Sequence, residues 1–196
     1  KWMMRSEPYF DCSDVGTAKR AFIDDLKDVL GQNEKLANSL PPNEASKEPI
    51  TDEMKSIRQA SFEDRLDVYK TQRIDDQAKW YIKKTSLNQR RAKQWFVVSV
   101  LLHLIAIVML LVKIGLPQVS FPIELFATAA SAVLTWLQAK KHNELGSSYS
   151  LTAHEIGLIK AESEFITNES ELSDFIINSE NAFSREHIQW VARKID

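Results

Sequence analysis

The sequence predicts an all-α membrane protein, built as a two-transmembrane helical hairpin with long cytoplasmic helical stalk extensions and a C-terminal helix that folds back. Two apolar segments, at about 95–113 and 122–138, flank a short stretch that contains Gly115, Pro117 and Pro122. Glycine and proline are otherwise few, and no long stretch alternates apolar and polar residues, which argues against a sheet. The alternative is a pair of buried helices in a soluble protein.

The first apolar segment is long enough to cross a bilayer as a helix. Its core, Trp95 to Val112, contains one histidine and no formal charge, and about 20 helical residues cross a hydrocarbon layer of about 30 Å. The second segment, Ile123 to Leu137, is shorter. The glycine and prolines between them end one helix and allow the next to begin close by. Two helices would satisfy their own backbone hydrogen bonds, as a lipid environment requires.

Basic residues mark one end of this hairpin. The stretch from Lys79 to Lys93 contains no acidic residue, and two lysines directly follow the second segment. The positive-inside rule therefore predicts that the open end and both termini are cytoplasmic. A nucleic-acid patch is the alternative, but the position next to an apolar segment favours lipid headgroups, so the expected partner is the bilayer. The predicted membrane-interface residues are Lys83, Lys84, Arg90, Arg91, Lys93, Trp95, Trp136, Lys140 and Lys141.

Residues 1–50 are predicted to be an N-terminal helical segment and linker, and residues 51–193 the membrane domain. Pro8 and Gly16 argue against a settled helix in residues 1–16. Apolar residues at helical spacing predict a helix from Thr17 to about Leu40, where two prolines stop it. The polar, proline-bracketed stretch 41–49 has the composition of a linker.

The stretch before the hairpin predicts one long helix. No glycine or proline occurs from Thr51 to Ile114, so a continuous helix would extend well beyond the membrane. Its intermittent apolar residues predict that the cytoplasmic part packs as a stalk in a helical bundle.

Two further helix boundaries are predicted after the hairpin. Gly146–Ser148 predicts a kink, after which Thr152 and Glu155 form the pattern of a capping box that restarts the helix. Asn168 followed by Glu171 predicts the start of a last helix that reaches Arg193. That helix repeats mostly apolar residues at steps of three and four, at Leu172, Ile176, Ser179, Phe183, Glu186 and Trp190.

The polar residues of the second apolar segment fall on one stripe. Their spacings of 4, 3, 4 and 3 keep them within an arc of about 80° on a helix. These residues are Glu124, Thr128, Ser131, Thr135 and Gln138. The first segment repeats the spacing, and depth in an antiparallel hairpin would match Lys113 with Glu124, His103 with Thr135 and Ser99 with Gln138.

The stripe has two interpretations. As a packing seam, its small and hydroxylated residues allow helices to approach closely, and Lys113 and Glu124 neutralise each other. As a pore lining, copies of the second segment surround an axis and form a ring of Glu124 at the outer mouth. One hairpin cannot enclose a channel, so the pore requires a homo-oligomer.

Catalysis finds little support in the sequence. The four histidines are scattered, no glycine-rich phosphate loop occurs, and His154-Glu155 lacks the second histidine of a zinc-protease helix. We therefore predict no enzyme, no cofactor and no metal site. The formal net charge of −2 suggests no polyanion partner, and Cys12 as the single cysteine fits a reducing compartment.

The chain resembles the SLATT superfamily, the SMODS and SLOG-associating two-transmembrane effector domains of bacterial conflict systems. Residues 73–84 (RIDDQAKWYIKK), followed by Asn88 and a basic stretch, are similar to the start of such a domain, and residues 50–54 (ITDEM) with Arg58, Arg65 and Tyr69 are similar to its lead-in. Residues 184–190 (SREHIQW) resemble its terminal helix. The resemblance covers about 51–193. It implies that residues 1–10 are the tail of a preceding related unit, as in tandem members.

This resemblance implies a membrane effector in antiviral defence that forms a pore or ion channel and damages the inner membrane of its own bacterial cell. It further implies a trigger, either a nucleotide signal or an upstream sensor as partner. The competing hypothesis is a non-conducting membrane anchor or scaffold whose cytoplasmic stalk recruits partners. Leakage from loaded vesicles distinguishes the two.

Overall fold

The computed structural model describes residues 1–10, 15–32 and 48–195. None of these residues lies in a β-strand, which confirms the all-α prediction for this part of the chain. The helices are α1 (Val15–Gln32), α3 (Asp52–Gln59), α4 (Phe62–Val68), the π-helix η2 (Tyr69–Ile74), α5 (Asp75–Gly115), α6 (Ile123–Lys140), α7 (His142–Glu162), the 3₁₀-helix η3 (Ser163–Phe165) and α8 (Glu169–Ile195).

The chain forms two compact units. One contains Lys1–Asp76 together with Gly157–Asp196, and the other contains Gln77–Ile156. The first unit therefore holds α1, α3, α4, η2 and α8, and the second holds α6 and most of α5 and α7.

In the first unit, the buried side chain of Arg58 holds the N-terminal residues. Arg58 donates to the backbone oxygens of Trp2 and, at 3.0 Å, of Tyr9, and its guanidinium lies 4.9 Å from the Trp2 ring centroid. Trp2 donates through its indole nitrogen to the Ala18 oxygen of α1 at 3.2 Å. Gly16, expected to prevent a helix, lies inside α1, and the predicted end of this helix at Leu40 falls outside the described residues.

The long helix predicted from residue 51 is interrupted at Ala60 and Ser61. Both residues are extended, and the Ser61 side chain caps α4 by accepting from the Asp64 amide at 3.1 Å. The prediction of one continuous helix is therefore wrong here, because serine and aspartate side chains compete locally with the helical backbone bonds.

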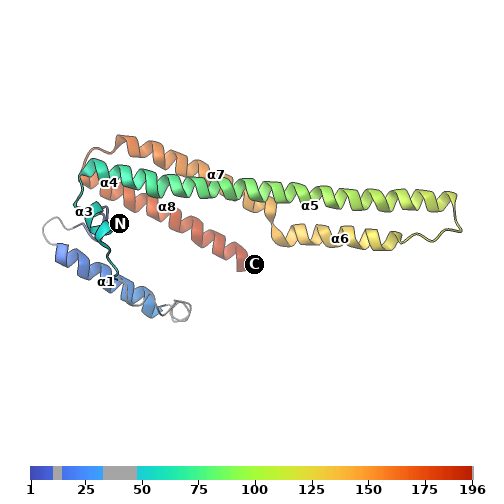
Figure 1. The fold of residues 1–196 in the computed structure, drawn as a ribbon, viewed down its shortest axis with the longest axis horizontal. Helices are drawn as coiled ribbons and strands as arrows, with labels where there is room; N and C mark the ends of the chain where they lie inside the picture. The colour runs from blue at the N-terminus through green and yellow to red at the C-terminus, as the bar shows by residue number, and fades with distance from the viewer. Residues whose placement is uncertain (11–14, 33–47, 196) are drawn as a thin grey trace. The chain divides into compact units, whose positions relative to one another are not determined.

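Helix α8 packs against α4 and η2 in the same unit (Figure 1). Arg65 pairs with Glu169, Tyr69 contacts the Phe175 ring edge-on at 6.0 Å, and Arg73 pairs with Glu180 at 2.7 Å. The predicted cap at the start of α8 is confirmed, since the Glu171 amide donates to Asn168 Oδ1 at 2.9 Å. The predicted face of α8 is buried at Leu172, Ile176, Ser179 and Phe183.

Glu180 makes the contact between α8 and η2 dependent on pH. Burial alone would raise the pKa of Glu180, but hydrogen bonds and charge from Arg73, with a hydrogen bond from Tyr69, lower it below 4.5 overall. A lowered pKa stabilises the fold above the unfolded pKa, and this stability is lost as pH falls through the folded pKa.

We expect Glu180→Gln to lower the free energy of unfolding by about 1–3 kcal/mol near neutral pH, because it removes charged hydrogen bonds to Arg73. The difference from wild type should shrink as pH falls through the folded pKa of Glu180, which lies below 4.5. Chemical unfolding in detergent, followed by circular dichroism, measures both. If the difference in unfolding free energy between the variant and the wild type were the same near neutral pH and below the folded pKa of Glu180, this role of the ionised carboxylate would be contradicted.

In the second unit, α6 lies beside α5 and is joined to it by residues 116–122 (Figure 1). Helix α5 ends at Gly115, and α6 begins directly after Pro122, as the glycine and prolines of this stretch predict.

The break after α6 lies at Lys141, and not at Gly146–Ser148 as predicted. Lys141 adopts a left-handed conformation with φ of 49°, which ends α6. Helix α7 then passes through Gly146 and Thr152 without interruption, so the predicted restart at Thr152 is also wrong. The Thr152 hydroxyl instead donates to the Ser148 oxygen of the preceding turn at 3.1 Å.

Gly146 allows a close approach of two helices. A Cβ at this position would meet Gln89 Cγ at 3.3 Å and the Gln89 amide nitrogen at 3.6 Å. The signal that predicted a kink therefore reflects contact between α7 and α5.

Candidate functional site: the α5–α6 hairpin

Helix α5 carries the apolar segment that is long enough to span a membrane. Within the described residues it belongs to the one helix that meets this requirement of length and composition, and 11% of its most apolar window is buried. The core helix of a soluble protein would be mostly buried. Exposed apolar side chains cover this part of α5, among them Phe96, Leu101, Leu104, Ile107, Val108 and Leu111. This exposure argues against the soluble alternative.

Each helix of the hairpin has one face that is less exposed than the rest of the helix. On α6 this face consists of Phe126, Ala130, Val133 and Leu137, with Ala130 fully buried. On α5 it consists of Ser99, Leu102, Ala106 and Met109. The spacings of three and four place each set on one side of its helix. The lower exposure of these residues indicates the sides that α5 and α6 turn toward each other.

The predicted polar stripe of α6 lies on the side away from α5. At about 100° per residue, its centre is roughly 150° from the centre of the α5-facing side. All five of its members, Glu124, Thr128, Ser131, Thr135 and Gln138, are exposed. The Ser131 and Thr135 hydroxyls each donate to the backbone oxygen four residues earlier at 3.0 Å.

The polar residues of the first segment are divided between two environments. Ser99 is buried on the α6-facing side, whereas His103 and Lys113 are exposed. The Nδ1–H of His103 donates to the Ser99 backbone oxygen at 2.8 Å. Among the ion pairs of the described residues, none joins Lys113 to Glu124. The two residues therefore do not neutralise each other within one chain in the way that the packing-seam interpretation expects.

Aromatic and basic side chains gather at the end of the hairpin where the basic stretch lies. The Trp95 and Trp136 rings lie 6.4 Å apart, and Lys140 Nζ lies 4.5 Å from the Trp136 centroid. Lys84 is partly buried over Trp80, 5.3 Å from its centroid. The other predicted interface cations are exposed: Lys83, Arg90, Arg91, Lys93, Lys140 and Lys141.

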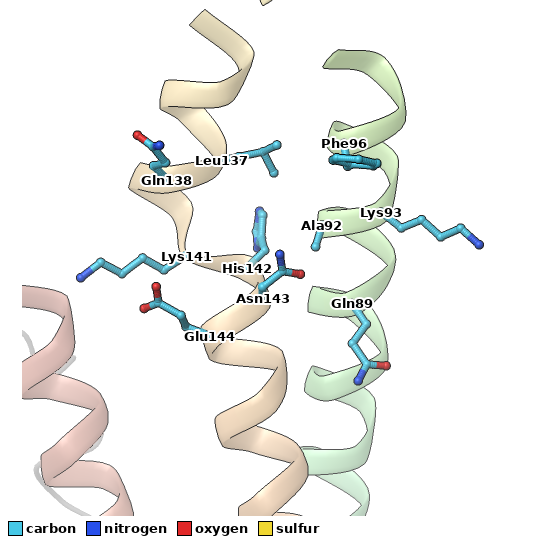
Figure 2. A pocket seen from close by; sticks show the side chains of 10 residues that line it. All are labelled: Gln89, Ala92, Lys93, Phe96, Leu137, Gln138, Lys141, His142, Asn143 and Glu144. Carbon is cyan, nitrogen blue, oxygen red and sulfur yellow. The ribbon is translucent and has the colours of Figure 1, made fainter. Parts of the chain in front are cut away.

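A cavity of about 490 Å³ lies at this end, on both sides of the break at Lys141 (Figure 2). In Figure 2 the side chains of Phe96, Leu137 and Ala92 lie toward its interior, with His142 between Leu137 and Ala92. The full lining is Gln89, Ala92, Lys93, Phe96, Leu137, Gln138, Lys141, His142, Asn143 and Glu144.

A buried hydrogen bond between Asn88 and His142 holds the His142 ring, which lines the cavity. Asn88 Nδ2 donates to the Lys84 oxygen at 2.9 Å, so Asn88 Oδ1 faces His142 and accepts from its Nδ1–H at 2.9 Å. Burial, with the positive charges of Arg91 and Lys140, lowers the pKa of His142 below 6.5. The ring is therefore neutral near pH 7.

The sequence did not predict this pair or the cavity. Asn88 and His142 are separated by 54 positions, and no local motif joins them. Within the described ranges, no group of three or more histidine, cysteine, aspartate or glutamate side chains is arranged to hold a metal ion.

Comparison with known families gives two matches. The model of SMODS and SLOG-associating 2TM effector domain 1 matches residues 69–190, and that of SMODS and SLOG-associating 2TM effector domain 3 matches residues 1–66. The first match covers more than half of the chain. Comparison with curated proteins gave no match, nor did comparison with solved structures.

Proposed function

The chain belongs to the SLATT family of two-transmembrane effector domains, and from this membership we propose that it forms an oligomeric pore that damages the membrane in which it lies. In this proposal α5 and α6 both cross the bacterial inner membrane, and the basic end of the hairpin and both termini are cytoplasmic. The remaining cytoplasmic helices form a stalk.

The observation that carries the proposal is the exposed polar stripe of α6. Its residues lie opposite the α5-facing side, so a single hairpin in a bilayer would turn them toward lipid. Ser131 and Thr135 satisfy their hydroxyl protons within the helix, but the Glu124 carboxylate and the Gln138 amide are costly in hydrocarbon. Several copies around an axis would remove this cost, because the stripe would then face water.

The dimensions of the stripe fit a membrane path. Glu124 and Gln138 are 14 positions apart, which is about 21 Å along a helix, or most of a hydrocarbon layer. The stripe would place a ring of carboxylates at the outer mouth and hydroxyls along the path. A ring of glutamates favours cations over anions.

In a bacterial conflict system, such a pore would act in antiviral defence once a trigger is received. Membership of the family supports an effector role. In the cell, an upstream sensor or a nucleotide signal would act as the trigger by raising conduction above a basal level, and the purified chain would retain that basal level.

The test is ion release from potassium chloride-loaded vesicles that contain the purified full chain. We expect release above that of protein-free vesicles, with potassium released faster than chloride. Glu124→Gln should lower this cation preference at least about twofold, because it removes the carboxylate ring. Glu155→Gln removes an exposed carboxylate outside the apolar segments and is the matched control.

Vesicles that stay tight around an inserted oligomer would contradict the pore. That result would instead support the membrane anchor or scaffold.

A further inference from the structure

The cavity at Lys141 combines two chemical environments. Phe96, Leu137 and Ala92 supply apolar wall, and Phe96 and Leu137 directly neighbour the paired tryptophans Trp95 and Trp136. Tryptophan pairs of this kind favour the boundary between headgroups and hydrocarbon. The apolar wall therefore lies at the depth where acyl chains begin.

Basic residues flank the cavity on both helices. Lys93 and Lys141 line it, and the positive charges of Arg91 and Lys140 act on His142 within it. Glu144 is the one acidic residue of the lining. In Figure 2 the Lys93 and Lys141 side chains extend to opposite sides, and their flexible stems allow both ammonium groups to turn toward an anion at the mouth.

We propose that this cavity binds one anionic phospholipid, with its phosphate between Lys93 and Lys141 and its acyl chains along Phe96 and Leu137. A cavity of about 490 Å³ is within the usual size of small-molecule sites. The left-handed backbone of Lys141 is unusual for a residue with a side chain, and such conformations cluster at binding sites. The proposal depends on the proposed membrane placement of α5 and α6, but not on conduction.

His142 couples this site to pH. Its Nδ1–H is held by Asn88, so Nε2 is the ring atom that gains a proton when the ring becomes charged. A bound phosphate offsets the surrounding positive charge, and it therefore raises the pKa of His142 and binds more tightly as pH falls. The charged groups near the ring are Arg91 and Lys93 on α5, Lys140 on α6, Lys141, and Glu144 on α7.

Native mass spectrometry of the full chain, released from detergent with added lipid, tests the proposal. We expect one phosphatidylglycerol per chain, bound at least about tenfold more tightly than phosphatidylcholine. Lys93→Gln with Lys141→Gln should remove this preference, because both charges that hold the phosphate are lost. Lys83→Gln with Arg90→Gln removes the same net charge from exposed residues outside the cavity and should change affinity less than about twofold.

Equal losses in the two double variants would overturn the site, since they would show attraction to the basic surface as a whole. His142→Gln should keep the lipid but lose the tightening of binding at low pH. Tightening that persists in His142→Gln would overturn the coupling.

Soluble phosphates identify the source of the anion. Inorganic phosphate and glycerol phosphate should fail to displace the lipid at millimolar concentration, because they lack contacts to Phe96 and Leu137. Displacement at that concentration would overturn the lipid assignment and show a site for free phosphate. Binding and leakage are measured separately, so a chain that binds lipid but leaves vesicles tight contradicts the pore alone.

Discussion

Arg65→Met is expected to lower the free energy of unfolding by about 3 kcal/mol. The Arg65 side chain is completely buried, pairs with Glu169, and donates to the backbone oxygens of Met4 at 3.0 Å and Ala60 at 3.3 Å. Removing one partner of a buried ion pair costs about 3–5 kcal/mol, because the other charge is left uncompensated. Glu169 is 38% exposed, which places the cost at the lower end of this range. Urea unfolding of the full chain in detergent, followed by circular dichroism, measures it.

Lys27→Met is the matched control. Lys27 also pairs with an acidic residue, Asp24, at 2.9 Å, but both side chains are about two-thirds exposed. Exposed pairs contribute about 0–1 kcal/mol, so its loss should be small. Arg65→Lys should be intermediate, because an ammonium group lacks the planar fork that reaches three acceptors together. If Arg65→Met were as stable as Lys27→Met, the ion pair would not hold α4 to α8.

Replacing Thr128, Ser131 and Thr135 together by leucine is expected to lower ion release from vesicles at least about tenfold. All three residues are exposed on the stripe of α6. Leucine removes every hydroxyl from the middle of the proposed path, and a hydrophobic constriction of this kind excludes water and ions. The variant should still insert, because it is more apolar than the wild type.

The control is a second triple variant, with leucine in place of Val97, Val100 and Val108 on the exposed side of α5. It changes the size of lipid-facing side chains without changing polarity, so ion release should be unaffected. Cross-linking of both variants reports the oligomer. Loss of the oligomer together with leakage would show that the stripe is a packing seam between copies, and unchanged leakage would show that it lines no path.

The apolar helix and the start of α8 were predictable because their signals are local. A run of apolar residues, a glycine and proline turn, and an Asn168–Glu171 cap each act within a few residues. The break at Ser61 also has a local signal, since Ser61 and Asp64 form a cap, and a helix can end at such a cap without glycine or proline.

The break at Lys141 and the cavity beside it could not be predicted in this way. Glycine at position 146 suggested a bend, yet its missing side chain serves the approach of Gln89 from another helix. The pair of Asn88 and His142 likewise exists only after α5 and α7 pack together. The stripe was predictable from spacing, but its direction is seen only in the folded chain, where the opposite, apolar side of α6 is the less exposed one.

The π-helix η2 keeps the successive contacts of α4 and η2 aligned along α8. Residues four apart drift by about 40° around an α-helix, so Arg65, Tyr69 and Arg73 would gradually rotate away from a straight neighbour. A π-turn holds one residue more than an α-turn and reverses this drift. Register along α8 is therefore set by the number of residues in this turn, and a single deletion there would separate Arg73 from Glu180 while leaving Arg65 beside Glu169.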